Sequence, residues 1–204
     1  MINKIKKHYS ESFEKHGPTS KGVDWKNENQ SIVRHNTFLN LITKSNVKNF
    51  SLLDVGCGYG SFYDYLISNQ YSNIKYLGID LVKEMIEHAK KKYNKDLFIV
   101  ENLLTFETKE QYDFVIANGL FTQKFNFTQN QMLRFFTECI LKLNKISRRG
   151  FLFNILSENI DFKNPKNFYL NKREVNNILN RQYYTNIENI SKNELFETFY
   201  MIHK

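Results

Sequence analysis

The chain contains a short apolar run that ends in an acid and is followed by glycine at every second position, Leu52-Leu53-Asp54-Val55-Gly56-Cys57-Gly58-Tyr59-Gly60. An apolar run of this length is typical of a buried strand, and the glycines predict that the chain turns sharply where the strand ends. Glycine adopts positive φ without strain and, lacking a Cβ, lets a ligand approach the backbone. The segment therefore predicts a strand that stops at a ligand, with the carboxylate of Asp54 beside the turn.

Beyond the glycines, short apolar strands alternate with amphipathic helices, which is typical of a parallel α/β sheet with crossover connections. The strands are expected at about 51–55, 74–80, 97–100, 112–117 and 151–156. The helices are expected at about 60–69, 82–93, 128–144 and 171–181. Two further extended runs, 183–190 and 195–203, are joined by residues 191–193 and predict a closing hairpin.

Residues 1–50 precede this pattern and are expected to form an N-terminal helical cap on a core of residues 51–204, the whole chain being a single domain. A Gly/Pro/Ser loop at 17–25 carries the only tryptophan, Trp25. The first helix of the cap shows an apolar stripe of Ile2, Ile5, Tyr9 and Phe13. The later helix shows a stripe of Ile32, Asn36, Leu39 and Ile42.

The glycine spacing distinguishes between nucleotide-like ligands. A dinucleotide fingerprint reads G-x-G-x-x-G, and here Ser61 stands where its third glycine would be. Gly-x-Gly-x-Gly preceded by Asp-Val resembles motif I of the class I S-adenosylmethionine-dependent methyltransferases, and the resemblance extends over about residues 50–157. It implies a Rossmann-like, mostly parallel seven-stranded sheet of order 3-2-1-4-5-7-6 with an antiparallel last strand. It also implies S-adenosyl-L-methionine as cofactor, S-adenosyl-L-homocysteine as product, and direct methyl transfer to an acceptor.

Polar residues stand at the ends of the next two strands, where an open parallel sheet binds its ligand. Asp80 could accept hydrogen bonds from both ribose hydroxyls, and it could also cap the helix that follows. At the end of the third strand the resemblance implies an acceptor for the adenine amino group, which Asn102 or its neighbour Glu101 could supply. Leu81 and Leu103 could sandwich the adenine ring or belong to the core.

The fourth strand ends in a segment where the resemblance implies motif IV, whose backbone lines the methionine half of the cofactor. An Asn-Pro-Pro-Tyr tetrad, which clamps planar amines in methyltransferases that act on adenine or glutamine, is absent because Gly119 and Leu120 follow Asn118. This disfavours DNA bases and protein glutamine as acceptors. The predicted cofactor-binding residues are Asp54, Gly56, Cys57, Gly58, Gly60, Asp80, Leu81, Asn102, Leu103, Asn118 and Gly119.

The catalytic machinery is less clearly encoded than the cofactor site. Because the sulfonium already activates the methyl group, positioning is the main catalytic contribution, and a general base is needed only if the acceptor arrives protonated. The candidate bases, each of which is equally compatible with an exposed polar role, are His8, His16, Glu158 and Asp161. The candidates for the acceptor pocket or a lid over it, which could instead belong to the core, are Tyr9, Trp25 and Phe121.

Composition restricts the partners. The net charge is +8, but the lysines are scattered, which disfavours a nucleic-acid partner and favours a small-molecule substrate. Two cysteines are too few for a disulfide framework or a Cys/His metal set, so no metal is expected. No run is long and apolar enough to span a membrane, and the N-terminus lacks the apolar region of a signal peptide, so we expect a cytoplasmic protein.

Three alternatives to a small-molecule methyltransferase stay open. An NAD(P)-dependent oxidoreductase would share the strand, the glycines and Asp80, although the glycine spacing and chain length disfavour it. An RNA methyltransferase would use the basic surface. A non-enzymatic relative could keep the fold and the cofactor, because fold does not fix function. Nothing in the sequence indicates an oligomeric state.

Overall fold

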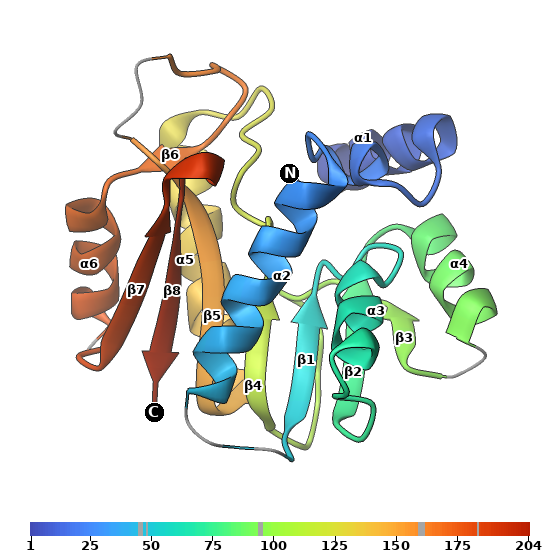
Figure 1. The fold of residues 1–204 in the computed structure, drawn as a ribbon. Coiled ribbons are helices and arrows are strands. Elements are labelled where there is room, and N and C mark those ends of the chain that lie inside the picture. The colour runs from blue at the N-terminus through green and yellow to red at the C-terminus, as the bar shows by residue number, and fades with distance from the viewer. Residues whose placement is uncertain (45–46, 48, 94–95, 159–161, 183) are drawn as a thin grey trace. The chain divides into compact units, whose positions relative to one another are not determined.

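The computed structural model describes the chain except for residues 45–46, 48, 94–95, 159–161 and 183 (Figure 1). The chain divides into two compact units, Met1–Glu107 and Thr108–Lys204, which we describe separately. The organisation of 1–204 as a single domain stays a prediction.

In the first unit, three parallel strands form a sheet in the order β3-β2-β1. Their register pairs Asp54 with Gly78 and Asp80 with Val100, so the carboxyl ends of neighbouring strands lie at one edge. The strands are β1 (Ser51–Val55), β2 (Lys75–Asp80) and β3 (Phe98–Val100), each close to its predicted range.

The helices of the first unit also follow the sequence pattern. Helix α4 packs on β2 and β3, α3 packs on α2, and α1 packs on α4 and on the short helix η1 (Figure 1). Gly17 has positive φ and ends α1, as its position in the sequence predicts. The helices are α1 (Ile2–His16), η1 (Ser20–Val23), α2 (Glu28–Thr43), α3 (Ser61–Ser68) and α4 (Lys83–Tyr93).

The buried face of α2 differs from the predicted stripe. Ile32 is 52% exposed and Asn36 is also exposed, so this part of the prediction is wrong. The helix instead buries Arg34 and His35 together with Phe38 and neighbouring apolar residues. Hydropathy could not reveal this face because four of its buried members are polar, namely Ser31, Arg34, His35 and Thr37.

In the second unit, the strand order is β4-β5-β8-β7, with β6 paired to β5. Strands β4 and β5 are parallel, whereas β8 is antiparallel to both β5 and β7. The strands are β4 (Tyr112–Ala117), β5 (Ser147–Ser157), β6 (Tyr169–Leu170), β7 (Ile187–Lys192) and β8 (Glu197–His203). The order in each unit agrees with the predicted order once β6, which the prediction omitted, is counted.

Two capped helices complete the second unit. Helices α5 (Gln129–Ile146) and α6 (Lys172–Arg181) both begin with a capping box, at Thr128 and Asn171 respectively. The predicted apolar face of α5 is buried, and α5 packs on β4 and β5 (Figure 1). The hairpin is confirmed, but its turn is not at 191–193: β7 continues to Lys192, and the short helix η2 (Asn193–Leu195) makes the reversal. These features confirm the mixed α/β, Rossmann-like class.

Candidate cofactor site

The glycine loop of the first unit has the backbone conformation that the sequence predicts. Gly56, Gly58 and Gly60 have φ values of 74°, 55° and 88°. The N–H groups of Gly56 and Cys57 both donate to the carbonyl of Ile79 on β2, at 2.8 and 3.1 Å. The loop is therefore tied to the neighbouring strand immediately before Asp80.

The surroundings of Gly58 and Gly60 differ. A Cβ on Gly60 would lie 3.0 Å from Tyr93 and 3.2 Å from Phe98, so this glycine allows close packing of aromatic side chains. A Cβ on Gly58 would lie 3.4 Å from Val23 and 3.8 Å from the sulfur of Met85, which are ordinary contacts. The need for glycine at Gly58 is therefore mainly conformational.

Asp80 joins the end of β2 to both the glycine loop and the turn that precedes α4. Its Oδ2 accepts the N–H of Gly58 at 2.9 Å, and its Oδ1 accepts the N–H of Val82 at 2.8 Å. Burial raises the pKa of Asp80, and the N–H groups of Val82, Gly58 and Leu81 oppose that shift. Val82 precedes α4, so its contact with Asp80 closes the turn before the helix and does not cap the helix itself. Three N–H groups leave the carboxylate one further lone pair, which can accept a ribose hydroxyl.

Asp54 lies beneath the loop. It is 1% exposed, and its Oδ2 accepts the hydroxyl proton of Tyr76 at 2.7 Å. Burial raises the pKa of Asp54 to about 7, with the Tyr76 hydrogen bond acting in the opposite direction. Asp54 therefore joins the end of β1 to β2 through a buried hydrogen bond. Direct contact of Asp54 with a ligand stays a prediction. No sequence signal identified Tyr76 as its partner.

The turn after β3 uses both candidate adenine acceptors internally. The Oε1 of Glu101 accepts the N–H of Asn102 at 2.8 Å, and the Oδ1 of Asn102 accepts the N–H of Leu104 at 3.2 Å. Each oxygen keeps a further lone pair, so neither residue is excluded as the acceptor. Leu103 is 6% exposed and Leu81 is half-buried, which leaves Leu81 the more accessible of the two predicted adenine neighbours.

The cap of the first unit reaches the glycine loop. Besides the contact of Val23 with the Gly58 position, the ring of Phe13 stacks on Tyr59 with centroids 6.4 Å apart. Burial, Asp24 and Asp80 together raise the pKa of Tyr9, which places its hydroxyl in the field of both carboxylates. Tyr9 therefore lies within electrostatic range of the predicted ribose carboxylate.

Trp25 has a different position within the cap. Its ring packs against the guanidinium of Arg34 at 5.0 Å and against the ring of His35 at 5.7 Å, so it anchors the loop to α2. Burial, followed by the nearby Arg34, lowers the pKa of His35 to about 3. Because His35 was not predicted from the sequence, this buried cluster is a feature that only the structure reveals.

The candidate bases are dispersed. His8 contacts Asp24, with Nε2 and Oδ2 2.5 Å apart, and His16 is exposed at the end of α1. In the second unit, Glu158 accepts hydrogen bonds from Lys163 and Asn171, which lower its pKa and make it a weaker base. Asp161 lies outside the described residues.

The turn after β4 in the second unit contains Asn118 and Gly119, and the latter has a φ of 77°. Gly119 donates its N–H to the Oδ1 of Asn154 at 2.7 Å, and its carbonyl accepts the hydroxyl proton of Thr122 at 2.9 Å. Phe121 is fully buried and packs against Phe136 and other aromatic rings, so the structure places it in the core of this unit rather than on an open pocket wall.

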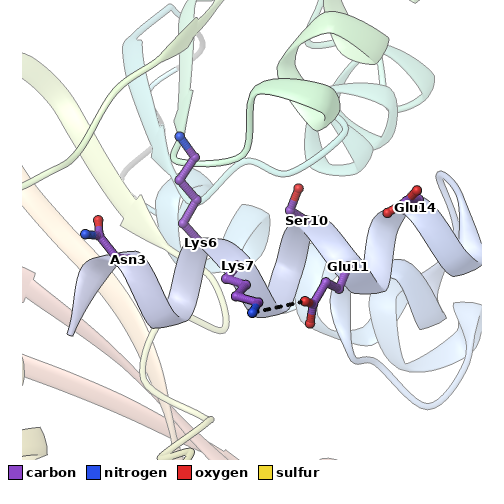
Figure 2. Close-up of a pocket in the computed structure, with 6 residues that line it drawn as sticks. All are labelled: Asn3, Lys6, Lys7, Ser10, Glu11 and Glu14. Atoms are coloured by element: carbon purple, nitrogen blue, oxygen red, sulfur yellow. Dashed lines mark ion pairs between the residues drawn. The ribbon is translucent and has the colours of Figure 1, made fainter.

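A hollow of about 330 Å³ lies along one face of α1, and none of the predicted cofactor residues lines it (Figure 2). Its lining is polar, and Lys7 and Glu11 form an ion pair 3.8 Å apart on the helix. Ser10 donates to Glu84 of α4 at 3.2 Å. The lining residues are Asn3, Lys6, Lys7, Ser10, Glu11 and Glu14.

Within the described ranges, no group of three or more His, Cys, Asp or Glu side chains is arranged to hold a metal ion. Among the helices that the structure describes, none has the length and apolar character needed to cross a membrane.

Comparison with known proteins identifies similar chains. Residues 46–199 match the family described as a methyltransferase domain. A Mycobacterium tuberculosis protein named as a methyltransferase is 26% identical over 161 residues, covering 76% of this chain and 93% of its own. A malonyl-[acyl-carrier protein] O-methyltransferase of Ilyobacter polytropus is 30% identical over 106 residues, but this match spans only 40% of that relative and 50% of this chain.

A solved structure supports the fold. Magnesium protoporphyrin IX methyltransferase from Synechocystis, determined with bound S-adenosylhomocysteine, superimposes with a TM-score of 0.63 at 15% sequence identity. The match covers 86% of this chain and 84% of that protein. At this level of identity the similarity concerns the fold.

Proposed function

The chain belongs to the class I S-adenosylmethionine-dependent methyltransferases, and we propose that it transfers the methyl group to an oxygen or nitrogen atom of a small molecule. The observation that carries the cofactor assignment is the contact between Asp80 and Gly58, which sets a carboxylate beside a glycine turn at the end of a parallel strand. One relative is named for methyl transfer to malonyl-[acyl-carrier protein], which supports an acceptor other than a nucleic acid.

The residues of the first unit suit the adenosine half of the cofactor. We assign the ribose to Asp80, because its carboxylate keeps a lone pair beside the backbone N–H groups that it accepts. Asn102 is assigned to the adenine amino group, with Glu101 as the alternative. We assign Gly56 and Gly58, whose positive φ forms the turn, to the cofactor loop, and Leu81 to an apolar contact with the adenine ring. Asn118 and Gly119 are proposed to serve the methionine half.

The reaction requires little further machinery. The cofactor supplies a methyl group activated by the positive sulfur. Held by the residues assigned above, the cofactor would supply this methyl group to a lone pair of the acceptor and leave as S-adenosylhomocysteine, and any acceptor proton would pass to solvent or to a base. Holding the acceptor in line contributes roughly 7 to 11 kcal/mol in well-oriented reactions. An acceptor that is already deprotonated, such as a carboxylate, needs no general base.

The acceptor class is tested by supplying methyl-labelled S-adenosylmethionine with panels of small carboxylates, alcohols and amines, and with RNA. We expect label to enter a small molecule, with one S-adenosylhomocysteine formed for each methyl group transferred. Asp80→Ala should lower this transfer at subsaturating cofactor.

The alternatives predict different outcomes of the same experiment. Labelling of RNA with a steep loss at higher salt would replace the small-molecule proposal with an RNA methyltransferase. Binding of the product without transfer to any acceptor would favour a non-enzymatic relative. A cytoplasmic location is part of the proposal and is tested by cell fractionation.

A further inference from the structure

The turn after β4 is held by a chain of hydrogen bonds from two other strands of the second unit. The N–H of Gly119 donates to Oδ1 of Asn154 on β5, and Nδ2 of Asn154 donates to Oε2 of Glu197 on β8; both distances are 2.7 Å. Asn154 is fully buried, and Glu197 is 1% exposed. A carboxylate on β8 therefore orients the side chain that holds a backbone amide at the end of β4.

The direction of each hydrogen bond is fixed. Gly119 can only donate through its N–H, so Asn154 must present its carbonyl oxygen to the turn and its amino group to Glu197. Burial of a carboxylate is costly unless hydrogen bonds compensate it. An apolar pair would fill the same space without this cost but could not hold the Gly119 amide. This arrangement therefore points to positioning of the turn.

Both sides of Gly119 are consequently restrained. Its N–H is bound by Asn154 and its carbonyl by Thr122, while its φ of 77° lies where only glycine is unstrained. The neighbouring side chain of Asn118 has a buried Oδ1 that accepts no hydrogen bond from the part of the chain described here. Preorganisation of such a turn lowers the ordering cost of ligand binding.

We propose that Asn154 and Glu197 are positioning residues, which hold the Asn118–Gly119 turn in its cofactor-binding conformation before the cofactor binds. The proposal rests on the methyltransferase function proposed above, in which this turn serves the methionine half. Neither residue is assigned to contact the cofactor. Their effect on affinity passes through the Gly119 amide.

The test reverses the direction of the hydrogen bond between the two side chains. In Asn154→Asp, two carboxylates face each other, and we expect S-adenosylhomocysteine affinity to fall at least tenfold. In Glu197→Gln, the introduced amide carbonyl still accepts from Asn154, so affinity should stay within threefold of the wild type. In the double variant, the introduced glutamine can donate to the introduced aspartate, which still accepts from Gly119, so affinity should recover to within threefold.

Amide hydrogen exchange supplies a second readout on the same proteins. Exchange of the Gly119 amide should accelerate in Asn154→Asp and slow again in the double variant. Asn154→Ala, which removes the acceptor without adding charge, should lower affinity at least fivefold and keeps the test decisive if Asn154→Asp does not fold. Ser147→Ala is the matched control, because Ser147 is equally buried and bonds the carbonyl of Asn144 at 3.1 Å. It should leave affinity unchanged.

Affinity within twofold of the wild type in both Asn154 variants would overturn the proposal, as would a double variant no better than Asn154→Asp. If the wild type binds no S-adenosylhomocysteine, the methyltransferase function fails separately. Hydrogen exchange of the Gly119 amide then tests the positioning role by itself. Acceleration at Gly119 that the double variant reverses would support that role, and unchanged exchange would overturn it.

Discussion

Two glycine amides, one in each unit, are held by side-chain oxygens in different ways. Gly58 donates to Asp80 at 2.9 Å, and Gly119 donates to Asn154 at 2.7 Å. Asp80 is half-buried and carries a charge that can bind a ligand as well as the loop. Asn154 is fully buried, with both ends of its amide occupied. Asp80 can therefore bind a ligand and hold its loop at the same time, whereas Asn154 can only hold its turn.

The largest expected effect concerns the different packing around Gly58 and Gly60. Gly60→Ala should destabilise the protein by about 3 kcal/mol, because a positive φ and crowding by Tyr93 and Phe98 act together. Gly58→Ala is the control and should cost only about 1 kcal/mol, since its Cβ meets ordinary contacts. Denaturant unfolding measures both losses. Equal losses would show that the two glycines are not distinguished by packing.

The next effect concerns the pH dependence of stability, to which two buried titratable groups of the first unit, Asp54 and His35, contribute. The pKa of Asp54 is raised from 3.8 to about 7, so its stabilising contribution is full below pH 3.8 and is lost as pH rises to 7. The pKa of His35 is lowered from 6.5 to about 3, so its contribution is full above pH 6.5 and is lost as pH falls to 3. Between pH 5 and 6.5 these two dependences have opposite signs, and each changes the free energy of unfolding by roughly 2 kcal/mol.

Substitution should separate the two dependences. His35→Phe should make the free energy of unfolding decrease as pH rises from about 5 to 6.5. Asp54→Asn should make the free energy of unfolding decrease as pH falls over the same range, because only the dependence of His35 then remains. Tyr76 can still donate to the introduced amide. Denaturant titrations across this range measure both slopes. If both variants show the same pH dependence of stability as the wild type, the dependences assigned to Asp54 and His35 are refuted.

A smaller effect tests the dual role of Asp80 directly. Asp80→Ala should weaken S-adenosylhomocysteine binding at least tenfold, or about 1.4 kcal/mol, by calorimetric titration. Asp64→Ala removes an exposed carboxylate of the same unit, paired with Lys92, and should leave affinity unchanged. If Asp80→Ala binds as tightly as the wild type, the ribose is held elsewhere.

The smallest effect concerns the anchor of the cap. Trp25→Leu should loosen the loop by about 1 kcal/mol, because it removes the contact of the ring with Arg34. Tryptic cleavage after Lys21 should then accelerate, whereas Trp25→Phe, which keeps an aromatic face, should change it less. Unchanged cleavage in both variants would contradict the anchoring role.

The same contrast explains what the sequence could predict. The glycine loop and Asp80 were predictable because their signals are local: a conformational requirement for glycine, and an acid at the end of an apolar strand. Asn154 and Glu197 lie 35 and 78 positions beyond Gly119 in the numbering, and each occupies a strand whose apolar pattern conceals it. A polar group that serves a partner far along the chain leaves no signal in a local pattern.

Two errors in the predicted elements have similar causes. The face of α2 was misassigned because Arg34 and His35 are buried by aromatic neighbours that come from other segments. The reversal before β8 was misplaced because Phe196 adopts a φ of 55°, a conformation that sequence usually marks with glycine. Both depend on tertiary contacts rather than on local preference.

The central claim is that the glycine loop and Asp80 form a site for S-adenosylmethionine rather than for a nicotinamide dinucleotide. Calorimetric titration of the wild-type protein with S-adenosylhomocysteine and with NADH tests it most directly. We predict saturable one-to-one binding of S-adenosylhomocysteine, weakened at least tenfold in Asp80→Ala, and no binding of NADH. Binding of NADH without binding of S-adenosylhomocysteine would contradict the account.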